Sequence, residues 1–461
     1  MEVVEVKKRA MALIDGEHYI PVLKGALEYV KKAYPQYEVV VAVFLGGTEK
    51  IGTPEDVKKA LPVPVILGEG NPPIETIVRT AKEYDVEVAL DMSDEPVVDY
   101  EKRMLIGSAL MAAGVRYEGA DFVFNPIDFQ DVAEHPSIKC IGLGKRVGKT
   151  AISTFTAITL KKMGFKPCVI KAARGGPEEP TPLFGEELEL SPEFLLKVAD
   201  SGKHAASDYY QEALLAGITT IGARRCGGGM VGKPFYSTEV EAVKLANTLP
   251  IDFIIVEGSG TTVPAVLNDA VELVISATTP LSHVKNFFGP YRVMISDLIV
   301  ITMAEEYNRD KVEQIKGAVR ELNPNAKVSE VVLRPEPLGD IRGKKIVFTS
   351  TAKKEALEKT IIPYLEEKYG CEVVGYSPWL SNRPKLREDL EKYLPKAEML
   401  VTELKAAAVD VATRMAVQRG LPVVYVNNVP ITVGGDVDLE EGIKELAKKA
   451  VERFNERKGK K

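Results

Sequence analysis

The chain has 461 residues, too many for one ordinary hydrophobic core, so two to four domains are expected. A hydrophobic fraction of 45% and a charged fraction of 27% are typical of a soluble globular protein, and a net charge of −6 argues against a nucleic-acid partner. No apolar run reaches the length of a membrane span, which argues against a membrane partner.

The first residues, "MEVVEVKKRAMALID", lack the long apolar segment of a signal peptide. The four cysteines, Cys140, Cys168, Cys226 and Cys371, are scattered without the spacing of a metal or redox pair. We therefore expect reduced thiols and a cytoplasmic location. The abundance of Glu and Lys is consistent with a thermophilic source.

Apolar, β-branched runs alternate with segments of helical length along most of the chain. We expect strands at residues 9–15, 37–47, 62–69, 86–93, 121–127, 137–143, 166–172, 217–223, 252–258, 271–277, 297–303, 344–350, 371–377, 397–403 and 422–428. Continuous apolar strands of this kind predict mostly parallel sheets with both faces covered, so the predicted class is α/β.

Two stretches interrupt this alternation. Residues 124–139 contain two prolines, and residues 321–345 are proline-rich and polar, as expected of a linker. We therefore predict three α/β domains, at residues 1–132, 133–330 and 331–461. The third domain follows the predicted linker, so it is a candidate lid over a ligand site.

The stretch "GLGKRVGKT" (142–150) joins a predicted strand to a predicted helix and has the composition of a phosphate-binding loop. Its spacing is unusual, because Leu143 stands where the standard pattern has a glycine. Backbone amides in such a loop converge on phosphate, Lys149 reaches the β- and γ-phosphates, and the Thr150 hydroxyl binds Mg²⁺. The predicted nucleotide-binding residues are Gly142, Gly144, Val147, Gly148, Lys149, Thr150 and Ala151.

This lengthened loop resembles that of dethiobiotin synthetase and its relatives among the deviant P-loop NTPases. Those enzymes carry an acidic residue at the end of a later strand, and this chain has "IIVEGSG" (254–260) in the corresponding place. The resemblance implies that Glu257 holds Mg²⁺ together with Thr150, and that the central domain is a P-loop domain of this type.

Basic residues gather at the predicted ends of strands. They are Lys145 and Arg146 in the loop, Lys171 at the end of the next strand with Arg174 just after it, Lys203 and His204 before a helix, and Arg224 and Arg225 ahead of a glycine-rich turn. Ligands of open α/β sheets collect at the carboxyl ends of strands, so this pattern predicts a highly charged anion in addition to ATP. A solvated basic loop is the alternative for the two arginines.

The N-terminal domain also places polar residues after strands. Asp15 and His18 follow the first strand, residues 46–50 the second, and residues 91–95 the fourth. These segments are expected to line one crevice. The turn at 46–50 is either a second anion site or a plain strand-to-helix connection.

Together, "LIDGEHYIPV", "FLGGTEK", "GLGKRVGKTA", "ARGGPEEP", "SGKHAASDYYQEAL", "RRCGGGMVG" and "VEGSG" resemble the archaeal cyclic 2,3-diphosphoglycerate synthetase family along the whole chain. The resemblance implies an ATP-dependent ligase that closes an intramolecular phosphoanhydride in 2,3-bisphosphoglycerate and releases ADP and phosphate. It also implies a cytoplasmic homodimer that uses Mg²⁺ and requires K⁺.

With that substrate, the predicted catalytic residues are Lys145, Arg146, Lys149 and Lys171, and the predicted substrate-binding residues are His18, Arg174, Lys203, His204, Arg224 and Arg225. Two enzymatic alternatives are a 2-phosphoglycerate kinase and a dethiobiotin-synthetase-like ligase. A partitioning or switch ATPase is the non-enzymatic alternative. Such ATPases usually carry an additional lysine where this chain has Gly144.

Overall fold

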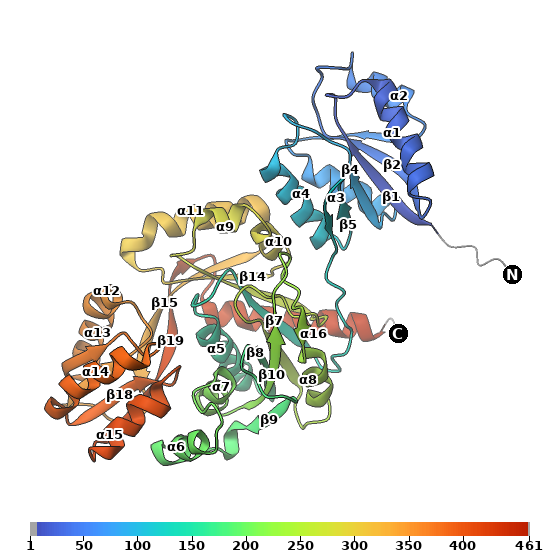
Figure 1. The fold of residues 1–461 in the computed structure, drawn as a ribbon. Helices are drawn as coiled ribbons and strands as arrows, with labels where there is room; N and C mark the ends of the chain where they lie inside the picture. Colours follow the sequence, from blue (N-terminus) through green and yellow to red (C-terminus); the bar gives the residue numbers. More distant parts are fainter. Residues whose placement is uncertain (1–6, 460–461) are drawn as a thin grey trace.

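The computed structural model describes residues 7–459 and arranges them as two sheets flanked by helices (Figure 1). Most neighbouring strands are parallel, so the predicted α/β class is confirmed. The strand β7 (Ser137–Gly142) is buried at every position, as expected for a strand with both faces covered. Within residues 7–459, no helix combines the length and apolar composition needed to cross a bilayer.

The N-terminal domain is a six-stranded sheet with the order β3-β2-β1-β4-β5-β6 among the described residues. Its elements are β1 (Lys8–Ile14), α1 (Ile20–Ala33), β2 (Tyr37–Phe44), α2 (Pro54–Ala60), β3 (Val65–Leu67), α3 (Ile74–Glu83), β4 (Val88–Asp91), α4 (Tyr100–Ala112), β5 (Arg116–Glu118) and β6 (Val123–Phe124). The strand order reverses between β1 and β4, so the loops after these strands lie at a topological switch point, where α/β sheets commonly bind ligands.

Figure 1 shows this domain set apart from the rest of the chain and joined to it by a single connection. Helix α4 nevertheless packs against α10 (Gly289–Met294) of the central domain. At this junction Phe124 meets Phe288 edge-on, with ring centroids 4.9 Å apart, and the Ser108 hydroxyl donates to the Phe287 carbonyl at 3.1 Å.

The second sheet has thirteen strands among the described residues, in the order β11-β10-β8-β12-β7-β13-β14-β15-β19-β18-β16-β17, with β9 beside β10. Its first part contains α5 (Lys149–Lys162), β8 (Pro167–Ala173), β9 (Thr181–Phe184), α6 (Pro192–Asp200), α7 (Asp208–Ala216), β10 (Thr219–Cys226), β11 (Tyr236–Ser237), α8 (Glu239–Ala246), β12 (Phe253–Glu257), β13 (Ala270–Ser276), α9 (Leu281–Lys285), β14 (Leu298–Thr302) and α11 (Arg309–Leu322).

The predicted linker at 321–345 is wrong, because it contains the strand β15 (Lys327–Pro337). The first part of β15 pairs with β14 in parallel, and nearly its whole length pairs with β19 (Val423–Gly435) in antiparallel. Strands β14, β15 and β19 therefore join the central and C-terminal parts into one sheet. The prediction failed because Pro335 and Pro337 resemble linker residues, yet they lie beyond the end of β14, where β15 has a neighbour on one side only.

The C-terminal part comprises β16 (Lys345–Thr349), α12 (Lys354–Ala356), α13 (Ile362–Tyr369), β17 (Glu372–Ser377), α14 (Arg383–Tyr393), β18 (Met399–Glu403), the π-helical turn η5 (Ala408–Thr413), α15 (Arg414–Gln418), β19 and α16 (Leu439–Gly459). Strands β16, β17 and β18 run parallel to β19, and hence opposite to the central strands. The loops at their carboxyl ends therefore turn back toward the carboxyl edge of the central sheet.

Helix α16 returns to the central domain instead of completing the C-terminal part. Leu439, Ile443, Leu446 and Ala450 recur at helical spacing and enter the core formed by β7, β13 and α5. The last segment of the chain thus closes the core beneath the glycine-rich loop. The predicted boundary between the second and third domains, residue 330, lies inside β15. The division into three domains therefore stays a proposal.

Candidate functional site

The loop after β7 passes into α5 through residues whose backbone angles favour glycine. Gly144 has φ +156° and Gly148, the N-cap of α5, has φ +91°. The Thr302 hydroxyl donates to the Val147 carbonyl at 2.7 Å, and a side chain at Gly148 would lie 3.2 Å from Leu333 of β15. The loop is therefore fixed by β14 and β15 on the side away from β12.

Lys149 lies across its own loop. A Cβ atom at Gly142 would be 2.8 Å from Lys149 Cδ, so the glycine gives the lysine its path. Lys149 Nζ donates to the carbonyls of Gly144 and Gly260 at 2.8 and 2.9 Å. Burial lowers the pKa of this amine to about 8, and the nearby Glu257 carboxylate opposes the shift. A phosphate beside Lys149 would favour its charged form further.

Lys171 and Glu257 form a buried ion pair on the neighbouring strands β8 and β12, with side chains 2% and 1% exposed. Lys171 Nζ also donates to the Thr150 hydroxyl at 3.1 Å and lies 3.7 Å from the Asp208 carboxylate. Burial alone would lower the pKa of Lys171, but the carboxylates around it outweigh burial and raise that pKa. The four residues predicted nearest the transferring phosphoryl and its metal, Lys149, Thr150, Lys171 and Glu257, therefore do lie together.

Glu212 and Ser153 belong to the same cluster, although sequence reasoning missed both. The Ser153 hydroxyl lies 2.6 Å from Glu257 Oε2 and also contacts Glu212 Oε1. Burial raises the pKa of Glu212 well above its ordinary value, and the Glu257 charge adds to that effect while Lys171 opposes it. One signal was present in the sequence: Asp208 and Glu212 are four residues apart on α7, so both face the site from one side of the helix.

Arg174 and Arg225 approach the loop from another direction. A Cβ atom at Gly260 would lie 3.4 Å from Arg174 Nη2 and 3.5 Å from Arg225 Nη2. Gly260 also accepts the hydrogen bond from Lys149, so three cationic groups converge on one backbone segment. Burial lowers the pKa of Arg225, and the charge of Arg174 lowers it further. An anion held between them would relieve that repulsion.

The other predicted basic residues are placed differently. Arg224 turns to the loop after β8, where it donates to the carbonyls of Pro177 and Gly176 at 2.8 and 3.3 Å. Lys145 and Arg146 are exposed on the loop. Arg146 reaches the C-terminal domain, because its Nη2 donates to the Ser381 hydroxyl at 3.2 Å.

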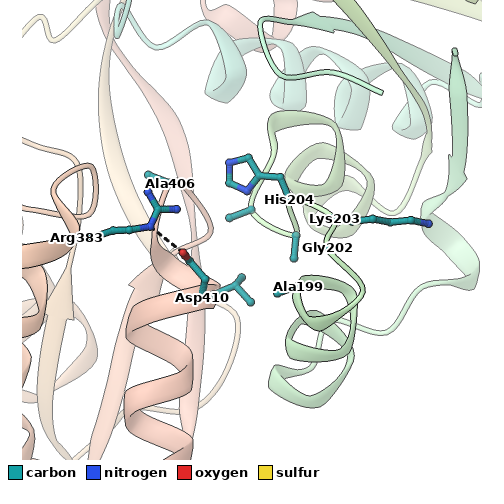
Figure 2. Close-up of a pocket in the computed structure, with 10 residues that line it drawn as sticks. Ala199, Gly202, Lys203, His204, Arg383, Ala406 and Asp410 are labelled. Carbon is teal, nitrogen blue, oxygen red and sulfur yellow. Dashed lines mark hydrogen bonds and ion pairs between the residues drawn. The ribbon is translucent and has the colours of Figure 1, made fainter. Parts of the chain in front are cut away.

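Lys203 and His204 line a pocket of about 280 Å³ between the connection from α6 to α7 and the C-terminal domain. Figure 2 shows His204 directed toward Arg383, which is paired with Asp410 on the opposite wall, whereas Lys203 points away from that wall. His204 therefore faces the C-terminal domain, Lys203 does not, and the pocket that they line includes neither Arg174 nor Arg225.

His18 lies in the N-terminal domain. Its Nδ1 atom is 2.7 Å from Oδ1 of the buried Asp15, and the Asp94 amide donates to Asp15 Oδ2 at 2.5 Å. Asp15 therefore links the segment that holds His18 to the segment that holds Asp94, whereas the predicted crevice itself stays a prediction. Among the hydrogen bonds of residues 7–459, none joins His18 to the central domain.

The residues of the central cluster fit a magnesium nucleotide. Gly142 leaves room for the lysine, and Thr150 and Glu257 offer a hydroxyl and a carboxylate, oxygen ligands that Mg²⁺ prefers. Over residues 7–459 no group of three or more His, Cys, Asp or Glu side chains is arranged to hold a metal ion by itself. Such a closed protein cage is not needed, because Mg²⁺ in nucleotide sites takes one or two protein ligands and completes its shell with phosphate and water.

Comparison with known proteins gives matches along the whole chain. Family models for the N-terminal, P-loop and C-terminal domains of cyclic 2,3-diphosphoglycerate synthetase match residues 9–125, 137–332 and 337–429. The chain is 44% identical over 454 residues to the cyclic 2,3-diphosphoglycerate synthetase of Methanothermus fervidus, covering 97% of this chain and 98% of that protein. It is 46% identical over 443 residues to the one of Thermococcus kodakarensis, covering 96% and 99%.

Among solved structures, LpxK from Aquifex aeolicus in complex with ATP has a TM-score of 0.41 and 14% identity, and the match covers 77% of this chain and 96% of that one. HypB from Archaeoglobus fulgidus has a TM-score of 0.27 and 17% identity, with 43% and 81% covered.

Proposed function

The chain belongs to the cyclic 2,3-diphosphoglycerate synthetase family, and we propose that it uses ATP to close a phosphoanhydride between the two phosphates of 2,3-bisphosphoglycerate. The observation that carries the proposal is the joint match of all three domains, with relatives aligned over nearly their full length. The buried cluster around Lys149 supports it, because phosphoryl transfer needs cations at the terminal phosphate.

Closing the ring requires a leaving group. One substrate phosphate takes the γ-phosphoryl of ATP, which breaks the bond to ADP and forms a new P–O–P bond on the substrate. An oxygen of the other substrate phosphate then attacks the substrate-side phosphorus, and inorganic phosphate departs. The attack is intramolecular, so alignment replaces encounter and lowers the barrier by several kcal/mol.

The residues of this chain have separate tasks in that scheme. Lys149 holds the terminal phosphates of ATP, and Lys171, with Lys145 and Arg146 from the loop, neutralises the phosphoryl group in transit. Thr150 and Glu257 hold Mg²⁺, which when bound draws negative charge from the phosphate oxygens. A phosphate dianion is already a competent nucleophile, so the scheme assigns no carboxylate as general base.

Arg174 and Arg225 are the proposed clamp for the substrate phosphates, because they converge beside Lys149 at Gly260. Bidentate binding of phosphate suits the arginine fork. Arg224 supports the clamp by holding the backbone at Gly176 and Pro177, next to Arg174. His18 and Lys203 remain proposed substrate-binding residues from the sequence alone.

We further propose a cytoplasmic homodimer with a K⁺ requirement, as the family resemblance implies. Light scattering of the purified protein measures the assembly. Replacing K⁺ by Na⁺ at constant ionic strength in the assay tests the monovalent ion.

The activity is tested by incubating the protein with ATP, Mg²⁺ and 2,3-bisphosphoglycerate and following phosphorus NMR. The expected product is a cyclic phosphoanhydride, formed together with equal amounts of ADP and inorganic phosphate. A parallel incubation replaces the bisphosphate by 2-phosphoglycerate. If an open bisphosphate forms there, and no cyclic product forms from 2,3-bisphosphoglycerate, the protein is a kinase instead. ATP hydrolysis without any change in the acceptor would refute both.

A further inference from the structure

The C-terminal domain contributes one wall of a pocket whose other wall belongs to the central domain. The pocket has a volume of about 280 Å³, with Lys203 and His204 on the central side and Arg383 and Asp410 on the C-terminal side (Figure 2). Its remaining lining is small: Gly202, four alanines and a valine. The lining therefore suits a compact polar ligand and offers no aromatic surface on which a nucleotide base would stack.

A contact near each wall reaches the proposed nucleotide site, from the glycine-rich loop on one side and from Lys171 of β8 on the other. On the C-terminal side, Ser381 accepts a hydrogen bond from Arg146 of the loop at 3.2 Å, and Arg383 follows two residues later. On the central side, His204 precedes Asp208, whose carboxylate lies 3.7 Å from Lys171 Nζ. Each wall of the pocket is therefore linked, through residues close to it in sequence, to a residue of the proposed nucleotide site.

The strand directions explain this position. Because the C-terminal strands run opposite to the central ones, the carboxyl ends of both blocks face one another across the cleft. Ligands of α/β sheets bind at carboxyl ends, so the cleft receives side chains from both blocks. The shared core of Leu195, Ala205, Leu404 and Val409 holds the walls together.

The charges of the pocket favour an anion. Arg383 Nε donates to Asp410 Oδ2 at 2.8 Å, and among residues 7–459 the Arg383 side chain makes no other hydrogen bond. The pair is open to water, with side chains 58% and 40% exposed, so Asp410 holds Arg383 weakly. Figure 2 shows the guanidinium and the His204 imidazole facing the same space.

We propose that Arg383 binds the anionic groups of the acceptor together with His204, and that Asp410 is the counter-ion which Arg383 leaves when the acceptor enters. This inference rests on the proposed function, since it names a second group of side chains for the bisphosphate of the same reaction, in addition to the proposed clamp of Arg174 and Arg225. It makes the C-terminal domain part of the substrate site.

The proposal predicts opposite effects from the two partners of one ion pair. Arg383→Ala removes a charged donor, so the KM for 2,3-bisphosphoglycerate should rise by about tenfold or more. Asp410→Asn frees Arg383 from a competing carboxylate, so the same KM should fall by about two- to fivefold, the strength of an exposed pair. If the pair were merely structural, both variants would change the KM in the same direction or leave it unaltered.

A second ion pair provides the matched control. Arg414 Nη2 lies 2.6 Å from Asp200 Oδ1 and joins the C-terminal domain to α6, but neither residue lines the pocket. Arg414→Ala therefore loosens the same domain junction without touching the proposed site. Its KM for the bisphosphate should equal that of the wild type.

The experiment uses the full-length protein and two readouts. The KM values for 2,3-bisphosphoglycerate and for ATP are measured in all four proteins, and melting temperatures check that each is folded. Binding of the bisphosphate without ATP is followed by fluorescence of Trp379, the single tryptophan of the chain, two residues from Ser381. We expect the KM for 2,3-bisphosphoglycerate to rise in Arg383→Ala and to fall in Asp410→Asn. The KM for ATP should stay unchanged in both variants.

An unchanged bisphosphate KM and affinity in Arg383→Ala would overturn the proposal, as would a rise of equal size in Arg414→Ala. These outcomes differ from failure of the proposed function. In that case the wild type forms no cyclic product, while the fluorescence titration still decides whether Arg383 binds the bisphosphate.

Discussion

Two buried amines stand side by side at the nucleotide site with opposite surroundings. Lys149 contacts only backbone carbonyls, and burial lowers its pKa to about 8. Lys171 is surrounded by carboxylates that raise its pKa despite burial. Lys149 is therefore the amine that would gain most from an incoming phosphate, whereas Lys171, in its proposed role, would have to leave Glu257 to contact the phosphoryl group.

Lys149→Ala should lower kcat by about 10²–10³-fold or more, because it removes a preorganised charge from the transferring phosphoryl. The fold should survive, since within residues 7–459 the lysine has no ion-pair partner within hydrogen-bond reach. Initial rates and melting temperature are the measurements. Lys162→Ala, an exposed lysine near the end of the same helix, is the control. Near-normal turnover in Lys149→Ala would contradict the assignment.

Glu272 lies on β13 under α5, where Thr156 donates to it at 3.2 Å. Burial raises the pKa of Glu272 to about 7, and hydrogen bonds from Thr156 and Cys140 oppose the shift. The folded state thus retains a proton that the unfolded chain releases above its ordinary pKa of 4.5. The contribution of this proton to the free energy of unfolding is complete below pH 4.5. It decreases by about 1.4 kcal/mol per pH unit above that and is lost once the pH has risen through 7.

Glu272→Gln removes this titration. Denaturant unfolding of both proteins between pH 4.5 and 8 should show the wild type losing about 3 kcal/mol relative to the variant, with the difference flattening above pH 7. Stability curves that run parallel over this range would show that Glu272 does not hold a proton in the folded protein.

At the scale of elements, β15 contacts the glycine-rich loop directly, and α16 packs into the core that carries the loop. Leu333 of β15 lies against Gly148, and α16 closes the core under β7. The nucleotide site therefore depends on segments almost 200 and 300 residues after the loop, counting along the printed sequence.

Leu446→Ala should destabilise the protein by about 2–5 kcal/mol, because it leaves a cavity in the central core. The effect should appear as a lower unfolding midpoint in denaturant. Leu338→Ala, at a leucine 46% exposed, should change the midpoint little. Equal effects from the two substitutions would contradict the packing of α16 on the central domain.

The sequence predicted the buried parallel strands well because each reads as a continuous apolar run between turns. The strand prediction failed at β15, where charged residues and two prolines alternate with apolar ones. This segment forms a strand because it pairs with the antiparallel strand β19, about a hundred residues later in the chain. No local pattern reports such a partner.

The same division applies to the site. Lys149, Thr150, Lys171 and Glu257 were predictable as neighbours because each follows or ends a strand of one parallel sheet, and such ends meet at one edge. Arg383 was not predictable, because it reaches the cleft only through the reversal of strand direction between β15 and β19. The position of Glu212 in the site was not predictable either, because it depends on how α7 packs against β8.

At the scale of the whole molecule, two blocks of parallel strands face each other across one cleft, with the glycine-rich loop on one side and Arg383 on the other. The N-terminal domain has its own sheet and packs on the central domain through α4 and α10, and Asp15 follows β1 at the switch point of that sheet. The central claim is that the loop holds the phosphates of Mg·ATP and aims the terminal one at the acceptor in this cleft.

The most direct measurement is a crystal structure of the protein with Mg²⁺, a non-hydrolysable ATP analogue and 2,3-bisphosphoglycerate. We expect the β- and γ-phosphates inside residues 142–151, with Lys149 on the γ-phosphate and with the bisphosphate in contact with the proposed clamp and with Arg383. A nucleotide bound elsewhere, with the loop free of phosphate, would contradict it.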